Sequence, residues 1–279
     1  KIYIFSIVYL TGSGSKGDGQ LLFMLNGLAK LKDDGQMAII QNGSSLFNGD
    51  AGSGPSEIRR YLIENDWLDA IVQLPNNAFY NTGIATYIWI VMKNKPAIHQ
   101  GKVQLIDASG CASSRRKNIG SKNVDISKAC RDLIIEAYGA YVDGTYNGVD
   151  ENDNTIIVKS KVMDAIDLGY NKIVVETPQF DDDGNIIMKK KKPVADTSKR
   201  DTENVPLAED IDAYFEREVI PYNPHAWIDK AKTKVGYEIP FTRTFYEYKQ
   251  IEPSDVIAAR IEKHEKSLMA KLHDLFGGE

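Results

Sequence analysis

The residues with the clearest chemical use lie in one loop between two apolar segments, within Leu74–Met92 (LPNNAFYNTGIATYIWIVM). A proline begins this polar loop, which carries the adjacent aromatics Phe79 and Tyr80 and then the tripeptide 81–83. Aromatic rings on a loop at a sheet edge can stack on a nucleobase drawn out of a helix. The same rings can equally fill gaps in the core beneath the loop, and residue types alone do not separate these two roles.

A G-x-G-x-x-G pattern occupies Gly12–Gly17, between an expected strand and an expected helix. In dinucleotide-binding proteins such glycines let the backbone approach a pyrophosphate, and an acidic residue after the next strand holds the ribose. Here Gln41 and Asn42 follow that strand, and Lys16 precedes the last glycine instead of following it as in a P-loop. We interpret the stretch as a flexible Gly/Ser connector.

Basic side chains gather in two places. One polar loop holds four of them without an intervening acid: Arg115, Arg116, Lys117 and Lys122. This pattern suits phosphate contacts as well as simple solvation. A second run, Lys189–Lys192, follows the aspartates Asp181–Asp183, and we expect these two runs to neutralise each other.

The sequence indicates no metal site, because no histidine pairs with another histidine or a cysteine at ligand spacing. Its two cysteines are too few for a disulfide framework in 279 residues, which fits a reducing, cytoplasmic compartment. No apolar run reaches the ~20 residues that span a bilayer, so no membrane partner is expected.

The net charge of −5 argues against a generic nucleic-acid coat protein. The acidic charge is concentrated at the end of the chain, because residues 201–279 carry −6 while residues 1–200 carry +1.

Apolar periodicity predicts alternating strands and helices up to Asp107 and a different pattern beyond Gly110. In the first part we expect strands at 2–9, 37–40, 67–74, 84–92 and 102–107, and helices at 20–31 and from an N-cap at Ser56 to about 65. This order predicts one edge of a mostly parallel sheet that finishes with antiparallel pairing.

In the second part we expect a polar loop at 113–123, a helix at 125–138, a linker or exposed loop at 141–154, a β-hairpin joining 172–176 to 185–189, and helices at 208–219 and 254–276. Apolar residues of the last helix approximate a heptad seam: Ile257, Ile261, Leu268 and Leu275, with Leu272 beside them. Such a seam suits a partner helix or the chain's own domain equally.

The sequence resembles the methyltransferase (modification) subunits of type I restriction–modification systems, which are N6-adenine DNA methyltransferases. Three stretches carry the resemblance: Asp18–Phe47 (DGQLLFMLNGLAKLKDDGQMAIIQNGSSLF), Ile58–Val91 (IRRYLIENDWLDAIVQLPNNAFYNTGIATYIWIV) and Gly101–Gly110 (GKVQLIDASG). The later segments LGYNKIVVETP, DTENVPL and KVGYEIPFTRTFYEY also look like the C-terminal part of that family. The order and spacing of these blocks agree from about Asp18 onward.

The resemblance implies an α/β fold, namely the second half of a Rossmann-like methyltransferase sheet ending in a β-hairpin, then an α+β extension and a C-terminal helix. It divides the chain into an unmatched lead at 1–17, the C-terminal half of the methyltransferase domain at 18–140, an extension with a β-hairpin at 141–252, and a subunit-docking helix at 253–279.

Enzymes of this family flip adenine out of duplex DNA and transfer a methyl group from S-adenosylmethionine to its N6. By resemblance, Phe79 is the loop aromatic that packs on the extruded base. The implied target-base pocket comprises Phe79, Tyr80, Asn81, Thr82, Gly83, Asn42 and Gly43. The basic residues Arg115, Arg116, Lys117 and Lys122 are then expected to contact DNA phosphates.

Two motifs of the family do not occur in this sequence: the cofactor loop of Asp-Pro-x-Cys-Gly-Ser-Gly type and the catalytic tetrapeptide of Asn-Pro-Pro-Phe type. We therefore expect a C-terminal portion of a longer enzyme that is inactive by itself and holds S-adenosylmethionine weakly or not at all. The expected partners are the specificity (S) subunit, docked on the heptad seam, the restriction (R) subunit and double-stranded DNA.

Two alternatives remain open. One is a non-catalytic interaction module that only docks a specificity subunit. The other is a different Rossmann-type enzyme that binds a nucleotide at Gly12–Gly17, which nucleotide-dependent thermal stabilisation would favour.

Overall fold

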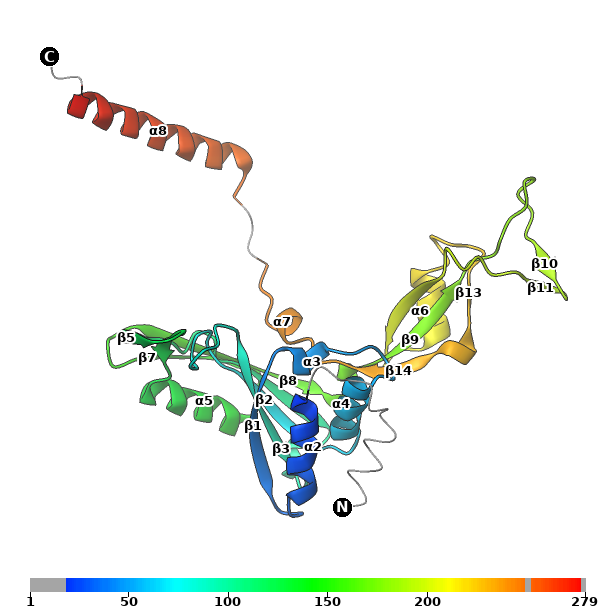
Figure 1. Ribbon diagram of the computed structural model, residues 1–279, viewed down its shortest axis with the longest axis horizontal. Helices are drawn as coiled ribbons and strands as arrows, with labels where there is room; N and C mark the ends of the chain where they lie inside the picture. The colour runs from blue at the N-terminus through cyan, green and yellow to red at the C-terminus, as the bar shows by residue number, and fades with distance from the viewer. Residues whose placement is uncertain (1–18, 249–251, 277–279) are drawn as a thin grey trace. The chain divides into compact units, whose positions relative to one another are not determined.

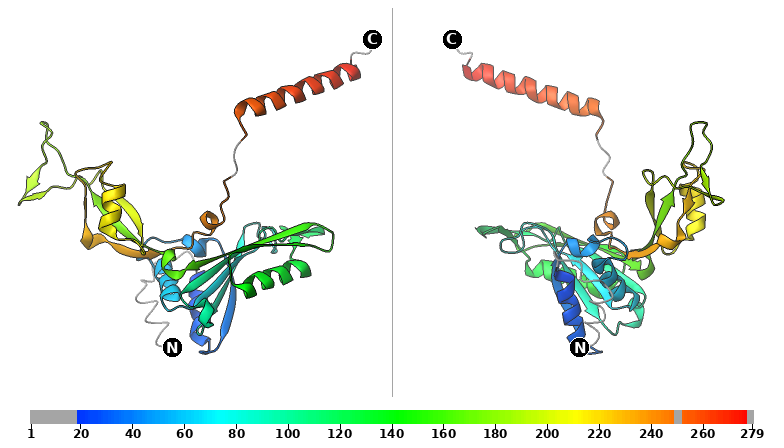
Figure 2. Two further views of the ribbon diagram at one scale, coloured as in Figure 1. Left: turned by 180° about the vertical axis from the view of Figure 1, so that it is seen from behind. Right: turned by 45° about the vertical axis from the view of Figure 1, so that its right-hand side comes forward.

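The computed structural model describes residues 19–248 and 252–276 (Figures 1 and 2). They form two compact units that divide between Phe245 and Tyr246. The strand expected at 2–9 and the connector Gly12–Gly17 lie outside the described residues.

The larger unit is built on a six-stranded sheet in the order β1-β3-β2-β4-β8-β7. Its strands are β1 (Gln36–Asn42), β2 (Leu68–Gln73), β3 (Thr86–Met92), β4 (Lys102–Asp107), β7 (Gly144–Val149) and β8 (Thr155–Asp164). Among these strands only β2 and β4 run parallel. The expectation of a mostly parallel sheet is therefore wrong for the described residues, since parallel neighbours need long crossovers while short connections without a helix return the chain antiparallel.

Helices cover both faces of this sheet. Along β2 successive side chains point to opposite faces, so Ile71 joins one core and Val72 the other. The first core lies under α2 (Gln20–Lys30) and α4 (Gly54–Glu64), whose apolar sides include Met24 and Leu62. The second core lies under α5 (Lys128–Ala140). This α/β layering confirms the expected fold class.

Several local expectations are wrong. The N-cap position of α4 is Ser53, whereas Ser56 is buried inside the helix and its hydroxyl accepts a hydrogen bond from the Tyr237 backbone N–H (3.0 Å). The linker expected at 141–154 contains β7, which pairs with β8 and so continues the sheet begun before residue 140. The polar loop expected at 113–123 is a hairpin of β5 (Ser113–Ile119) and β6 (Lys122–Asp125).

An α+β extension follows β8, as expected. Its central strand is β9 (Gly169–Glu176), which pairs with β12 (Asp201–Pro206), β13 (Trp227–Ile228) and β14 (Lys234–Tyr237). The helix α6 (Ile211–Glu218) packs on this sheet through Phe215. The short helical turns are α3 (Ser44–Phe47), α7 (Phe241–Thr244), η1 (Ala97–His99), η2 (Ala165–Leu168) and η3 (Lys230–Lys232).

The expected hairpin between 172–176 and 185–189 is wrong, because β9 has other partners. The turn at 181–184 does form, closed by a bridge between Phe180 and Ile186. The next residues make a separate small hairpin, β10 (Met188–Lys189) and β11 (Lys192–Pro193).

A buried arginine ties the extension to the sheet. Arg59 of α4 has no exposed surface, and it donates through Nε to the Tyr237 carbonyl (2.6 Å) and through Nη1 to the Ser45 carbonyl (3.1 Å). Burial lowers its pKa to about 10. Because each donated bond satisfies a backbone carbonyl, Arg59 fixes the end of β14 against the first core.

The smaller unit consists chiefly of α8 (Ser254–Phe276), which has the bounds expected from the sequence. None of its described residues is buried, and the seam residues Ile261, Leu268 and Leu275 are exposed. In the part of the chain that the structure describes, no helix is both long and apolar enough to cross a bilayer.

Candidate functional site

The strand register brings the predicted pocket residues to one end of the sheet. Asn42, the last residue of β1, lies opposite Thr86, which begins β3 just after residues 74–85, the loop named here the target loop. Gln73, the last residue of β2, lies opposite Tyr87 of β3 and beside Asp107, which ends β4. The carboxyl ends of β1, β2 and β4 therefore meet where loop 74–85 leaves the sheet, which is the end where α/β sheets hold their ligands.

Asn42 is held by polar contacts within the chain. Its backbone N–H donates to Gln20 Oε1 (2.8 Å), and its own Oδ1 accepts from Gln20 Nε2 (3.0 Å) and from the Ser44 N–H (2.9 Å). These bonds fasten the start of α2 to the end of β1. The neighbouring Gly43 approaches the Tyr87 ring so closely that a β-carbon there would lie 3.3 Å from it. These contacts hold Asn42 and Gly43 at the end of β1, next to the start of β3.

The target loop is a tight turn. Phe79 and Thr82 form a β-bridge, with Tyr80 and Asn81 between them, and Asn81 adopts a left-handed conformation (φ 57°). Phe79 is half-buried and packs against the second core, whereas the side chain of Tyr80 is exposed, with 64% of the residue accessible. Phe79 therefore has part of its ring packed in the core beneath the loop, whereas the Tyr80 ring faces solvent.

The basic residues lie on the β5–β6 hairpin, directly against the target loop. The Asn123 N–H donates to the Asn77 carbonyl (3.3 Å), and a β-carbon on Gly120 would lie 2.9 Å from Asn81 Oδ1 and 3.0 Å from the Tyr80 ring. The sequence analysis missed Gly120, although a Gly-Ser pair between two extended segments is a hairpin signal. The structure therefore brings the target loop and the basic cluster together.

The four cations of the hairpin are not equivalent. Arg115 and Lys122 both bond to Asp125, at 2.5 and 3.1 Å, and these two hydrogen bonds lower the pKa of the Asp125 carboxyl. Arg116 and Lys117 are exposed and make no ion pair within the described segments. Arg116 and Lys117 are therefore the two cations of the hairpin that are available to bind an external anion.

A second set of polar residues, which the sequence analysis also missed, is buried beneath the sheet. The fully buried Asp69 carboxylate faces His99 Nδ1 (2.9 Å) and accepts a hydrogen bond from the Tyr138 hydroxyl (2.6 Å). Tyr141 stacks on the His99 ring at 3.5 Å between centroids and donates to the Asp69 carbonyl (3.3 Å). These bonds join β2 to η1 through His99 and to α5 and its C-cap through Tyr138 and Tyr141, so the role of the set is structural.

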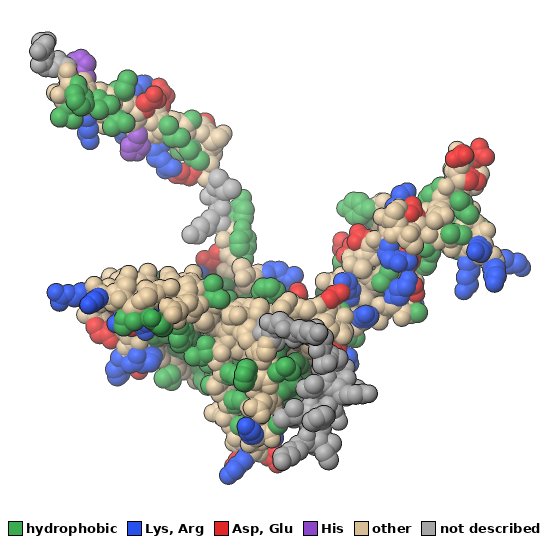
Figure 3. Space-filling model, viewed as in Figure 1, with side chains coloured by type: hydrophobic (Ala, Val, Ile, Leu, Met, Phe, Trp, Pro, Cys, Tyr) green, Lys and Arg blue, Asp and Glu red, His purple; other side chains and the backbone are tan. Residues whose placement is uncertain are grey.

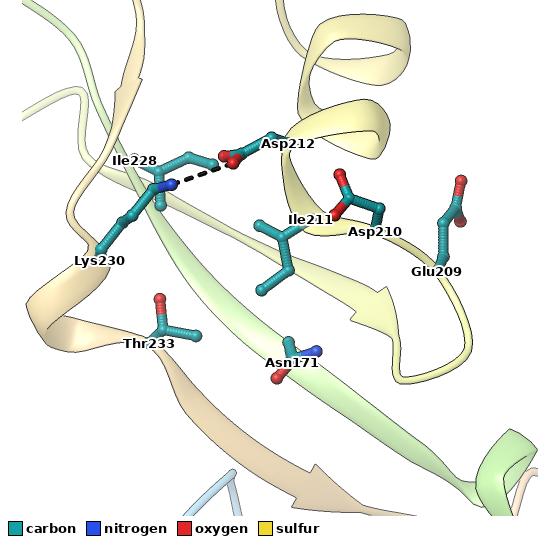
Figure 4. Close-up of a pocket in the computed structure, with 8 residues that line it drawn as sticks. All are labelled: Asn171, Glu209, Asp210, Ile211, Asp212, Ile228, Lys230 and Thr233. Atoms are coloured by element: carbon teal, nitrogen blue, oxygen red, sulfur yellow. Dashed lines mark hydrogen bonds and ion pairs between the residues drawn. The ribbon is translucent and has the colours of Figure 1, made fainter.

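A pocket of about 470 Å³ in the extension lies apart from these residues (Figure 4). Its carboxylates are already engaged: Asp212 pairs with Lys230 (3.0 Å) and Asp210 caps α6 by accepting from the Ala213 N–H (2.9 Å). The residues that line it are Asn171, Glu209, Asp210, Ile211, Asp212, Ile228, Lys230 and Thr233.

Within the described ranges no group of His, Cys, Asp and Glu side chains is arranged to hold a metal ion.

Comparison with known proteins assigns a family. The family profile described as N-6 DNA methylase matches residues 8–177, which is more than half of the chain. The methylase subunit of the type I restriction enzyme MjaIX from Methanocaldococcus jannaschii is 31% identical over 105 residues, covering 37% of this chain and 18% of its own length. The corresponding MpnII subunit from Mycoplasma pneumoniae is 33% identical over 114 residues, covering 40% and 20%.

Among solved structures, a type I restriction–modification methyltransferase subunit from Streptococcus thermophilus matches 55% of this chain and 28% of its own, with 27% identity and a TM-score of 0.44. The chain spans about a fifth of the length of the curated relatives that it matches. The resemblance found in the sequence is confirmed, and the chain belongs to the N-6 DNA methylase family.

Proposed function

We propose that this chain forms the target-base side of a type I DNA methyltransferase subunit, which transfers a methyl group from S-adenosylmethionine to adenine N6. One observation carries the proposal: the turn at 79–82 leaves the carboxyl end of the sheet, and a hairpin with two unpaired cations lies against it. An aromatic turn offers a surface for an extruded base, and adjacent cations suit the phosphates that flank it.

The two aromatics take different parts in this proposal. Phe79 is anchored in the second core, so its ring has a fixed position, as a base-stacking surface requires. Tyr80 is exposed and lies against Gly120, which places it toward the basic hairpin. We propose that Phe79 stacks on the flipped adenine and that Tyr80, Asn81, Thr82 and Gly83 shape the rim.

The residues described here do not by themselves fit the cofactor. Asn42, the pocket-wall amide at the end of β1, has its side-chain oxygen engaged by Gln20 and Ser44. The glycine-rich cofactor loop and the Asn-Pro-Pro-Phe tetrapeptide do not occur in the sequence. We propose that the chain alone holds S-adenosylmethionine weakly or not at all and therefore transfers no methyl group, and titration calorimetry of the chain with S-adenosylmethionine tests the binding. Micromolar binding would contradict the proposal.

The base-stacking role is tested in a full-length subunit that carries this segment. Phe79→Leu keeps an apolar side chain packed on the second core but removes the aromatic face. We expect a large fall in the methylation rate with little change in S-adenosylmethionine affinity, while Phe23→Leu, an exposed substitution on α2, is the matched control. Equal methylation rates for Phe79→Leu and the parent would exclude stacking by Phe79.

We also propose that α8 docks on the specificity subunit through its seam, which would place target recognition on that partner. The exposed apolar residues of the helix support this, since such a row is favourable only when covered. Leu268→Lys should abolish co-purification with the specificity subunit, whereas Lys263→Ala, outside the seam, should not. Co-purification that survives Leu268→Lys together with Ile261→Lys would exclude docking through the seam.

A further inference from the structure

A small hairpin in the extension concentrates positive charge. β10 and β11 pair Lys189 with Lys192, and Lys190 and Lys191 form the two-residue turn between them. All four lysines are exposed. The end of this ribbon is therefore a cluster of four ammonium groups on consecutive residues.

The hairpin holds these lysines in an unfavourable arrangement. Both turn residues have left-handed backbones, with φ of 52° at Lys190 and 63° at Lys191, a conformation that favours glycine and asparagine. Lys189 and Lys192 lie directly opposite each other, and like charges in that position destabilise a strand pair. Folding alone gives no reason for lysine at these four positions, whereas an external anion would relieve the repulsion between the ammonium groups.

No acid within the described residues neutralises the cluster, so the expected mutual neutralisation with Asp181–Asp183 is wrong. Asp181 instead accepts hydrogen bonds from the backbone N–H groups of Asp183 and Asn185, closing its own turn. Figure 3 shows blue side chains gathered apart from the red tip of the neighbouring turn. The lysines thus remain available to a partner.

We propose that this lysine hairpin contacts the phosphate backbone of duplex DNA. The inference rests on the proposed function, which makes DNA the polyanion that this chain meets. A two-stranded ribbon is narrow enough to lie in or along a groove, and flexible lysines suit phosphates because they carry charge without base-specific geometry. The hairpin therefore adds affinity that does not depend on sequence, in addition to the site proposed to receive the base.

The test is fluorescence anisotropy of the 279-residue chain with a labelled 30-base-pair duplex of mixed sequence, over a series of salt concentrations. The variant carries Lys189→Gln, Lys190→Gln, Lys191→Gln and Lys192→Gln. Each lost phosphate contact reduces the slope of log K against log salt by about 0.9. We expect the slope to fall by about 2 to 4 and the affinity at low salt to drop about tenfold or more.

A matched control removes the same charge elsewhere. Lys128, Lys161, Lys199 and Lys230 are exposed lysines that already pair with acids, and their fourfold change to Gln should leave the slope nearly unchanged. Equal slopes for the hairpin variant and the parent would overturn the inference, as would equal losses in both fourfold variants. Loss of binding to anionic lipid vesicles without loss of DNA binding would also overturn it.

These outcomes are separable from those of the proposed function. If methylation by a full-length enzyme depends on Phe79 but its DNA affinity is unchanged in the lysine-hairpin variant, only this inference is overturned. Salt-dependent DNA binding through the hairpin with no effect of Phe79→Leu on methylation would overturn only the stacking role.

Discussion

Gly120, in the turn of the β5–β6 hairpin, lies so close to Asn81 that a β-carbon on the glycine would come within 2.9 Å of the Asn81 amide oxygen. The backbone of Gly120 is also left-handed, with φ of 57°. The missing side chain therefore sets how closely the basic hairpin approaches the target loop. Any larger residue must displace the Asn81 and Tyr80 side chains, or else shift the hairpin away from the loop.

Gly120→Ala should accordingly disturb the target loop. A left-handed alanine costs about 1 kcal/mol of stability, and displacing Asn81 and Tyr80 should add roughly 1 kcal/mol or more. Gly101→Ala is the control, because Gly101 has a similar φ of 70° but no neighbour within 4 Å. We expect faster hydrogen exchange across 77–83 only in Gly120→Ala. Equal losses of unfolding free energy in both variants, with unchanged exchange, would contradict this packing.

Tyr138→Phe should destabilise the chain by about 1 to 3 kcal/mol, the cost of removing a hydrogen bond from a buried charged group. Its hydroxyl donates to Asp69, which has no exposed surface. Tyr146→Phe is a suitable control, since Tyr146 packs on the same core without a hydroxyl partner among the described residues. Urea unfolding of the two variants measures the difference, and equal midpoints would show that the Asp69 network contributes little.

The elements that the sequence predicted well are those with strong local signals. Leu21, Leu25 and Leu28 recur at helical spacing and are buried on α2, and the strand 102–107 has the predicted bounds. β7 was missed because its sequence, GTYNGV, is polar and glycine-rich, and only pairing with β8 makes it a strand. Strand direction was also misjudged, since it follows from how the connections return rather than from composition.

The candidate site stays a prediction, but the sequence did indicate which residues lie together at the end of the sheet. The pocket residues occur in two sequence blocks that the resemblance covers, and the register brings Asn42 to the end where the loop leaves. The Asp69 network joins residues separated by 30 and 69 positions, and no local pattern marks such a contact. The division of roles between Phe79 and Tyr80 depends on burial, which two adjacent aromatics do not reveal.

Tyr237→Phe should change how stability depends on pH. Burial and the Glu64 carboxylate raise the pKa of Tyr237 from 10 to about 12. The folded chain keeps a proton that the unfolded chain loses above pH 10, so this stability is complete below pH 10 and declines as pH rises toward 12. Urea unfolding between pH 8 and pH 11 should show a shallower decline in Tyr237→Phe. The exposed Tyr222→Phe should retain the parent's slope, and identical slopes in all three would refute the assignment.

The two cysteines should be inert in the folded chain. Cys111 and Cys130 have no exposed surface, and burial together with the neighbouring Cys130 raises the pKa of the Cys111 thiol to about 12. Because the thiolate is the reactive form, a raised pKa and loss of access both suppress reaction. Ellman's reagent at pH 8 should label neither thiol in the native chain and both in urea, with Cys111→Ala leaving one. Rapid native labelling that disappears in Cys111→Ala would show that Cys111 is accessible and that α5 opens from the second core.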